Sequence, residues 1–172
     1  VLRPADAMEA AECWEIALEM ENTRSILALS RQGLPAVRDA YSQENKSLLG
    51  AYTLWGADDA DAVIFATGSE VQIALTAAKE LTEAGISARC VSVPSMELFA
   101  AQSEDYKKSV FGTAKARVAV EAGIEMGWHK LLGDKGRFVG MTGFGASGEI
   151  NDLYQHFGIT TKAVVEAAKA QL

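Results

Sequence analysis

The fold is decided by a strand–turn–helix segment, Ala62-Val63-Ile64-Phe65-Ala66-Thr67-Gly68-Ser69-Glu70. Its first six residues are almost entirely apolar, as in a strand that is buried on both faces of a sheet. The last three residues form a turn, and Ser69 and Gln72 stand at the spacing of a helix capping box. The segment therefore predicts a buried strand followed directly by a helix.

Strands and helices keep alternating around this segment. The helix after the turn is predicted to end at Gly85, and its apolar face consists of Val71, Ala74, Leu75, Ala78 and Leu81. Further strands are predicted at 51–55, 89–93, 116–120 and 138–141, and further helices at about 96–109, 128–132, 149–157 and 161–172. This order is typical of a three-layer α/β/α domain with a mostly parallel sheet.

Residues 1–35 have the pattern of a β-α-β fragment from a second α/β domain. A short extended piece is followed by Asp6 and Glu9, an acidic capping pair, and by a helix over about 7–20. A buried strand is predicted at 25–29. Two strands and one helix cannot bury both faces of a sheet, so we expect the rest of that domain outside this sequence. One face of the helix is apolar: Ala10, Ala11, Trp14, Ala17 and Leu18.

A change in composition marks the boundary between the two domains. Residues 36–47 have no clear period and are mixed in charge, with Arg38, Asp39, Glu44 and Lys46. Such a segment is typical of an interdomain linker. Residues 48–172 are then predicted to form the complete second domain.

The composition excludes several classes of function. The 172 residues are 49% apolar and 23% charged, and no apolar run approaches the roughly 18 residues that span a bilayer. A net charge of −7 and a pI of about 4.9 disfavour nucleic-acid binding, which needs a basic surface. Cys13 and Cys90 are expected to be buried free thiols, in keeping with a reducing cytoplasm.

Arg31 is the candidate binding residue. It lies in the stretch Leu27-Ala28-Leu29-Ser30-Arg31-Gln32-Gly33-Leu34-Pro35, directly after the strand predicted at 25–29. Ligands of open α/β sheets bind at the carboxyl ends of strands, and a guanidinium group suits a carboxylate or a phosphate. Position alone leaves two interpretations open, a contact to an anionic ligand or a structural salt bridge.

Other polar positions have simpler explanations. The loop 143–148 matches G-x-G-x-x-G, but it follows the last strand, so a turn that needs positive φ values is preferred to a dinucleotide site. The turn at 67–69 could hold an anion, although a plain strand–helix turn is simpler. Glu121 is expected to pair with an amide or an arginine. His129 and His156 have no metal-ligand or nucleophile pattern beside them and receive no role.

Motifs along the whole sequence resemble those of transketolases. The most specific is Leu29-Ser30-Arg31-Gln32-x-Leu34-Pro35. The others, in order, are Arg3-Pro4-Ala5-Asp6-x-x-Glu9, Trp14, Gly50-Ala51-Tyr52, Ala66-Thr67-Gly68-Ser69-Glu70-Val71, Gly85-Ile86, Val91-Ser92-Val93-Pro94, Val120-Glu121-Ala122, Gly127-Trp128, the loop Gly143-Phe144-Gly145-Ala146-Ser147-Gly148, and Phe157-Gly158-Ile159-Thr160.

The resemblance implies a place for this chain in a larger enzyme. Residues 1–35 would be the end of the thiamine-pyrimidine-binding domain, 36–47 the linker and 48–172 the carboxyl-terminal domain. Transketolases are cytoplasmic homodimers that use thiamine diphosphate with Mg²⁺ or another divalent metal such as Ca²⁺. They transfer a two-carbon ketol unit between ketose and aldose phosphates, in the pentose phosphate pathway or the Calvin cycle.

The resemblance also implies which residues act. Arg31 would contact the sugar phosphate. No catalytic, cofactor-binding or metal-binding residue is expected in this chain, because those motifs lie in the missing part, and Glu121 is not the acid that activates the cofactor. The chain alone is therefore expected to be inactive, with no nucleic-acid or membrane partner.

Two alternatives stay open on the sequence. Dihydroxyacetone synthase shares the Leu29–Pro35 motif, so the substrate is not decided between the two enzymes. The second alternative is a free-standing α/β module that binds a small ligand or forms oligomers through the loop Gly143–Gly148.

Overall fold

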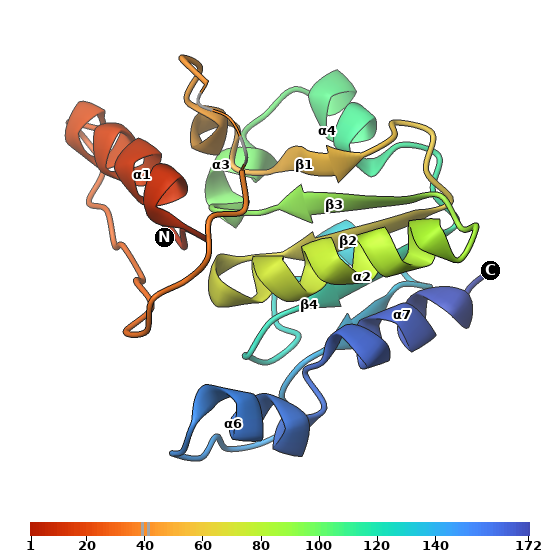
Figure 1. Ribbon diagram of the computed structural model, residues 1–172. Coiled ribbons are helices and arrows are strands. Elements are labelled where there is room, and N and C mark those ends of the chain that lie inside the picture. Colours follow the sequence, from red (N-terminus) through yellow and green to blue (C-terminus); the bar gives the residue numbers. More distant parts are fainter. Residues whose placement is uncertain (39, 41) are drawn as a thin grey trace.

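The computed structural model describes residues 1–38, 40 and 42–172. Within these residues one mixed sheet has the strand order β1-β3-β2-β4-β5 (Figure 1). Its strands are β1 (Tyr52–Gly56), β2 (Ala62–Ala66), β3 (Ala88–Ser92), β4 (Ala116–Val120) and β5 (Arg137–Val139). The edge strand β1 runs antiparallel to β3, and the other pairs are parallel. The predicted α/β class with a mostly parallel sheet is confirmed.

Helices cover both faces of the sheet. Strands buried on both faces send successive side chains to opposite sides. Ile64 packs in the core beneath α2 (Val71–Glu83) and α7 (Thr161–Lys169), which lie side by side in front of the sheet in Figure 1. Val63 and Phe65 pack in the opposite core, which contains residues of α3 (Met96–Ala100), α4 (Glu104–Phe111) and α5 (His129–Leu132).

Local signals explain where several helices begin and end. The end of α2 at Gly85 is confirmed, because Gly85 has a φ of 84° and the Ile86 amide donates to the Leu81 carbonyl. The single helix predicted at 96–109 is wrong: Ser103 caps a separate helix, accepting from the Tyr106 amide at 3.2 Å. The cap predicted at Ser69 is also wrong, because its hydroxyl donates to the Glu70 carboxylate within a short turn, η2 (Gly68–Glu70).

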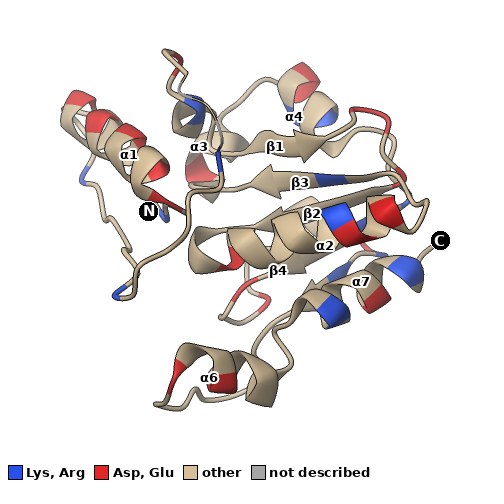
Figure 2. Ribbon diagram, viewed as in Figure 1, with Lys and Arg blue, Asp and Glu red and all other residues tan. Residues whose placement is uncertain are grey.

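The amino-terminal segment contains one helix, α1 (Ala7–Glu19), which Asp6 caps as predicted. Its predicted apolar face is not the buried one: Trp14 is 55% exposed and Leu18 is 75% exposed. The buried face instead consists of Glu9, Glu12, Cys13 and Ile16. The two buried carboxylates find hydrogen-bond donors on residues far along the chain, so α1 turns an acidic side toward the sheet domain. Figure 2 shows the acidic residues along α1 in red.

The strand predicted at 25–29 is not formed. Leu27 makes one isolated parallel bridge to Leu2, while Ile26 and Leu29 are 64% and 58% exposed. Within the described residues, the backbone of this stretch pairs with Leu2, and a single bridge does not form a sheet. The buried environment expected for this stretch is therefore absent here.

Parts of the predicted linker over 36–47 pack against the rest of the chain. Val37 and Arg38 are buried, and a short turn, η1 (Lys46–Leu49), leads into β1. Asp39, one of its charged residues, and position 41 lie outside the described residues. None of the described helices has the length and apolar character needed to cross a bilayer.

The remaining helix, α6 (Ile150–Phe157), follows the glycine-rich loop. Its Tyr154 and Phe157 pack on the edge of the core beneath α2 and α7. Cys13 and Cys90 are free and buried, as expected. Burial raises the pKa of the Cys13 thiol to about 12, so this thiol stays protonated at neutral pH.

Candidate functional site

The candidate site is the edge of the sheet at which the parallel strands end. At this edge β2 is followed by Thr67, β3 by Val93 and β4 by Glu121. The amino-terminal segment with α1 lies across these ends (Figure 1). Ligands bind to open α/β sheets on this side, because the loops here bring polar groups from several strands together.

Arg3 joins the amino-terminal segment to three strand ends. Its amide donates to the Pro94 carbonyl at 2.8 Å, and its own carbonyl accepts from the Gly68 amide at 3.2 Å. Its guanidinium forms an ion pair with Glu121, which also accepts from the indole of Trp128 at 2.6 Å. The expectation that Glu121 pairs with an arginine is confirmed.

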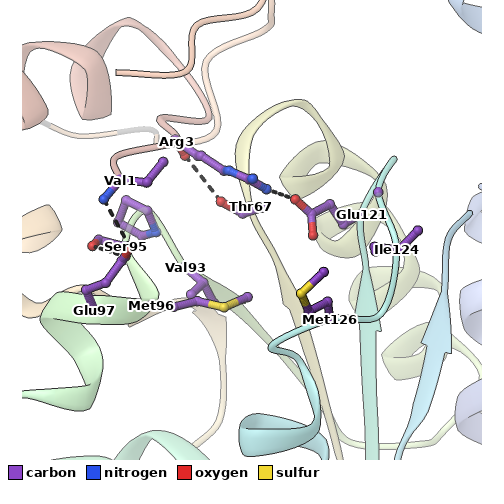
Figure 3. Close-up of a pocket in the computed structure, with 12 residues that line it drawn as sticks. Val1, Arg3, Thr67, Val93, Ser95, Met96, Glu97, Glu121, Ile124 and Met126 are labelled. Carbon is purple, nitrogen blue, oxygen red and sulfur yellow. Dashed lines mark hydrogen bonds and ion pairs between the residues drawn. The ribbon is translucent and has the colours of Figure 1, made fainter. Parts of the chain in front are cut away.

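A groove of about 430 Å³ opens beside this ion pair, as Figure 3 shows. It is lined by polar groups of Arg3, Thr67, Ser95, Glu97 and Glu121 and by apolar side chains such as Met96 and Met126. The charges of Arg3 and Glu121, which lie nearest the strand ends, neutralise each other. The turn at 67–69 holds the Arg3 carbonyl, so the plain strand–helix turn describes it better than an anion site.

Glu9 is the most deeply buried carboxylate of the chain's described part. Its Oε1 accepts from the hydroxyls of Tyr52 at 2.7 Å and Ser92 at 2.6 Å, and its Oε2 accepts from the Ala5 amide at 2.7 Å. Burial raises the pKa of Glu9 above its ordinary value of 4.5, and the hydrogen bonds from Ser92 and Tyr52 offset part of that shift. This network joins α1 to β1 and β3.

Glu12 makes a second link, to the segment before β1. Its carboxylate pairs with Arg38 at 2.8 Å and accepts from the Ser47 hydroxyl at 2.7 Å. Burial acts to raise its pKa, but the hydrogen bonds from Arg38 and Ser47 outweigh burial and leave the pKa below its ordinary value. Glu12 is therefore an ionised partner of Arg38 at neutral pH.

Arg31 is exposed and lies in a bend between α1 and η1. The ion pairs of arginines given for the described residues involve Arg3, Arg38 and Arg89, and the role of Arg31 stays a prediction. The bend is held near both ends: the Ala28 amide donates to the Leu2 carbonyl at 2.8 Å, and the Val37 amide donates to Asp6 at 3.0 Å. The bend that carries Arg31 therefore lies between two backbone anchors.

The glycine-rich loop 143–148 follows β5 and leads into α6. Phe144 is fully exposed, and Gly143, Gly145 and Gly148 are absent from the glycines with positive φ. The expectation of a turn that needs positive φ values is therefore wrong, because the loop runs through ordinary backbone conformations. Gly143 and Gly145 also have open space where a side chain would stand, so no close backbone approach requires glycine there.

The histidines do not form a site within the described residues. His129 begins α5, and His156 packs edge-on against Phe157 with ring centroids 4.8 Å apart. The described part of the chain contains no group of three or more His, Cys, Asp or Glu side chains that could hold a metal ion.

The network of Glu9, Glu12 and Arg38 was not predicted from the sequence. A usable signal was present: Glu9 and Glu12 are three residues apart, and therefore share a helix face that also carries Cys13 and Ile16. Two carboxylates on a buried face must have donors, but the donors Tyr52 and Ser92 are 43 and 83 residues from Glu9. Their identity depends on the tertiary structure.

Comparisons with known proteins agree with this architecture. Residues 50–160 match a family model described as the transketolase-like C-terminal domain. The transketolase of Sinorhizobium medicae is 54% identical over 170 residues, which are 98% of this chain and 24% of that protein. The chloroplastic transketolase of Spinacia oleracea is 44% identical over 174 residues, 99% of this chain and 23% of that protein.

Solved structures give the same result. A transketolase from Leishmania mexicana superposes with a TM-score of 0.89 at 38% identity, covering 99% of this chain and 24% of that one. A Pichia stipitis transketolase in complex with sedoheptulose 7-phosphate has a TM-score of 0.86 at 37% identity, with the same coverage. This chain spans about a quarter of the length of these relatives. On this evidence the chain belongs to the transketolase family.

Proposed function

We propose that this chain is the carboxyl-terminal part of a transketolase that transfers a two-carbon ketol unit between ketose and aldose phosphates. The observation that carries the proposal is the match of 98% of the chain, at 54% identity, to 24% of a transketolase. We further propose that residues 1–35 end the pyrimidine-binding domain, that 36–47 link it to the domain at 48–172, and that the whole enzyme is a cytoplasmic homodimer.

The cofactor of such an enzyme, thiamine diphosphate with Mg²⁺, does not fit the described residues. These residues contain no set of three metal-ligating side chains, and the carboxylates of Glu9, Glu12 and Glu121 are already engaged by protein donors. We therefore assign no catalytic residue to this chain and propose that it is inactive alone.

Arg31 is the residue that we propose contacts the sugar phosphate. It is exposed, it lies on a loop anchored near both ends, and none of the ion pairs of the described arginines involves it. A planar guanidinium can donate two parallel hydrogen bonds to phosphate oxygens. Solved relatives from Pichia stipitis are described as complexes with xylulose 5-phosphate and sedoheptulose 7-phosphate, which supports a sugar phosphate as the partner.

The test is Arg31→Ala in the full-length enzyme. Loss of a charge-assisted hydrogen bond should raise the KM for phosphorylated sugars about ten- to hundredfold. The kcat and KM for sugars that lack the phosphate should stay near the parent values, because they never made the contact. Steady-state kinetics on both substrate classes measure the difference.

Arg24→Ala is the matched control, since Arg24 is an exposed arginine of the same segment and should leave both KM values unchanged. An equal loss with both substrate classes in Arg31→Ala would show that Arg31 does not recognise the phosphate.

A further inference from the structure

Asp6 has two separate partners, one on each carboxylate oxygen. Oδ1 accepts from the Glu9 amide at 2.8 Å and caps α1. Oδ2 accepts from the Val37 amide at 3.0 Å, across 31 residues of sequence. Asp6 and Val37 are each 7% exposed, so water competes little for this second bond. A helix cap needs only one carboxylate oxygen, so the bond of the second oxygen to Val37 is not explained by capping.

The second bond closes the loop that carries Arg31. Upstream, the Ala28 amide donates to the Leu2 carbonyl, and downstream the Val37 amide donates to Asp6. The two anchoring residues, Leu2 and Asp6, are four residues apart in the segment that leads into α1. Between the anchors lie Gly33 and Pro35, and most of this stretch is exposed. Little else in the described structure restrains the loop.

We infer that Asp6 is a positioning residue for the phosphate contact: its Oδ2 holds the downstream end of the loop 29–36 and so restricts where Arg31 can lie. This inference rests on the proposed role of Arg31. A guanidinium that is already placed loses less conformational freedom when it binds a phosphate than one on a free loop. Release of the anchor should therefore weaken phosphate binding while leaving the reaction chemistry intact.

Asp6→Ser in the full-length enzyme separates the two roles of the side chain. Serine caps a helix about as well as aspartate, but its one oxygen, placed to accept from the Glu9 amide, leaves no acceptor at the position from which Oδ2 of Asp6 accepts from Val37. We expect the KM for phosphorylated sugars to rise about fivefold, the equivalent of one lost hydrogen bond, with kcat and the KM for unphosphorylated sugars unchanged. Asp6→Asn is the second variant, because its amide group presents donors rather than an acceptor to Val37.

Two further variants make the result specific. In the Arg31→Ala background, Asp6→Ser should have no additional effect on KM, because the residue that it positions is gone. Ser103→Ala removes the cap of α4 and should lower stability without changing either KM. A rise in KM for both substrate classes, or a rise that persists in the Arg31→Ala background, would overturn the inference.

The same experiments keep the inference apart from the proposed function. If Arg31→Ala affects both substrate classes equally, the phosphate contact itself is wrong. If Arg31→Ala is selective for phosphorylated sugars and neither Asp6 variant changes their KM, the contact stands and only the positioning role of Asp6 fails.

Discussion

At the residue scale, Glu9 shows how a buried carboxylate is accommodated between two parts of the chain. It is fully buried, and three donors surround it, from Ala5, Tyr52 and Ser92. Three hydrogen bonds do not fully replace the hydration that a carboxylate has in water. The protonated form of Glu9 is therefore more favoured in the folded protein than in the unfolded chain. The hydroxyls of Tyr52 and Ser92 can donate or accept, which lets the network tolerate either form of Glu9.

The raised pKa of Glu9 predicts a pH dependence of stability. The unfolded carboxyl loses its proton near 4.5, while the folded one keeps it to higher pH. The contribution of protonated Glu9 to the free energy of unfolding is therefore complete below pH 4.5 and is lost as the pH rises through the pKa of the folded protein. The loss is at most about 1.4 kcal/mol per pH unit. Glu9→Gln should remove this dependence and become more stable, relative to the parent, as the pH increases.

Denaturant unfolding at several pH values measures the difference. The side-chain amide introduced by Glu9→Gln can donate to Tyr52 and Ser92 while its oxygen accepts from Ala5, so the variant should keep the network. Glu19→Gln is the control on the same helix, because Glu19 is exposed. A stability difference between Glu9→Gln and the parent that does not change with pH would contradict the assignment.

At the element scale, the turn between η1 and β1 depends on Gly50. Gly50 has a φ of 77°, and its carbonyl accepts from the Ser95 amide at 3.0 Å. A side chain here would overlap the backbone of Ser95, which caps α3, and of Phe99 within α3. Only glycine satisfies both the conformation and the close approach.

Gly50→Ala should therefore cost more than an ordinary glycine substitution. We expect a loss of at least about 3 kcal/mol in the free energy of unfolding, from backbone strain plus displacement of α3. Gly133→Ala is the matched control: Gly133 also has a positive φ, of 63°, but nothing lies within 4 Å of the added carbon. It should cost about 1 kcal/mol. Equal losses in denaturant unfolding would show that the contact with α3 is unimportant.

Elements that were predicted correctly have their causes in nearby residues. The apolar run that forms β2 and the glycine that ends α2 need no distant partner to be recognised. The helix predicted at 96–109 failed because its apolar period hides a break at 101–103, where Ser103 starts a new helix. A serine inside an apolar pattern does not show by itself whether it caps a helix or lies within one.

At the scale of the whole molecule, the chain presents a sheet domain with an amino-terminal segment across the ends of its strands. The networks of Glu9 and Glu12 fasten α1 and the segment before β1 to that domain. Exposed apolar residues of α1 and of the stretch at 25–29 face outward. This arrangement fits a segment whose other partners belong to the longer protein proposed above.

Isothermal titration calorimetry of this chain with thiamine diphosphate and Mg²⁺ tests the proposal that the cofactor binds to other parts of the full-length enzyme. No heat of binding is expected, because the described residues offer no metal-ligand group and their buried carboxylates already have partners. The full-length enzyme, titrated in the same way, is the positive control. Tight binding by the isolated chain would contradict the proposal that the cofactor site lies elsewhere.

The sequence by itself determined the fold class, the alternation of strands and helices in the sheet domain, and the family. Buried strands require continuous apolar runs, helix ends require particular residues, and each of the family's motifs is a short stretch that can be read locally. Only the tertiary structure decided which face of α1 is buried and that the stretch at 25–29 is exposed. It also decided that Asp6 reaches Val37. The reason is physical: burial and pairing of these side chains depend on partners 26 to 83 residues away, which no local pattern specifies.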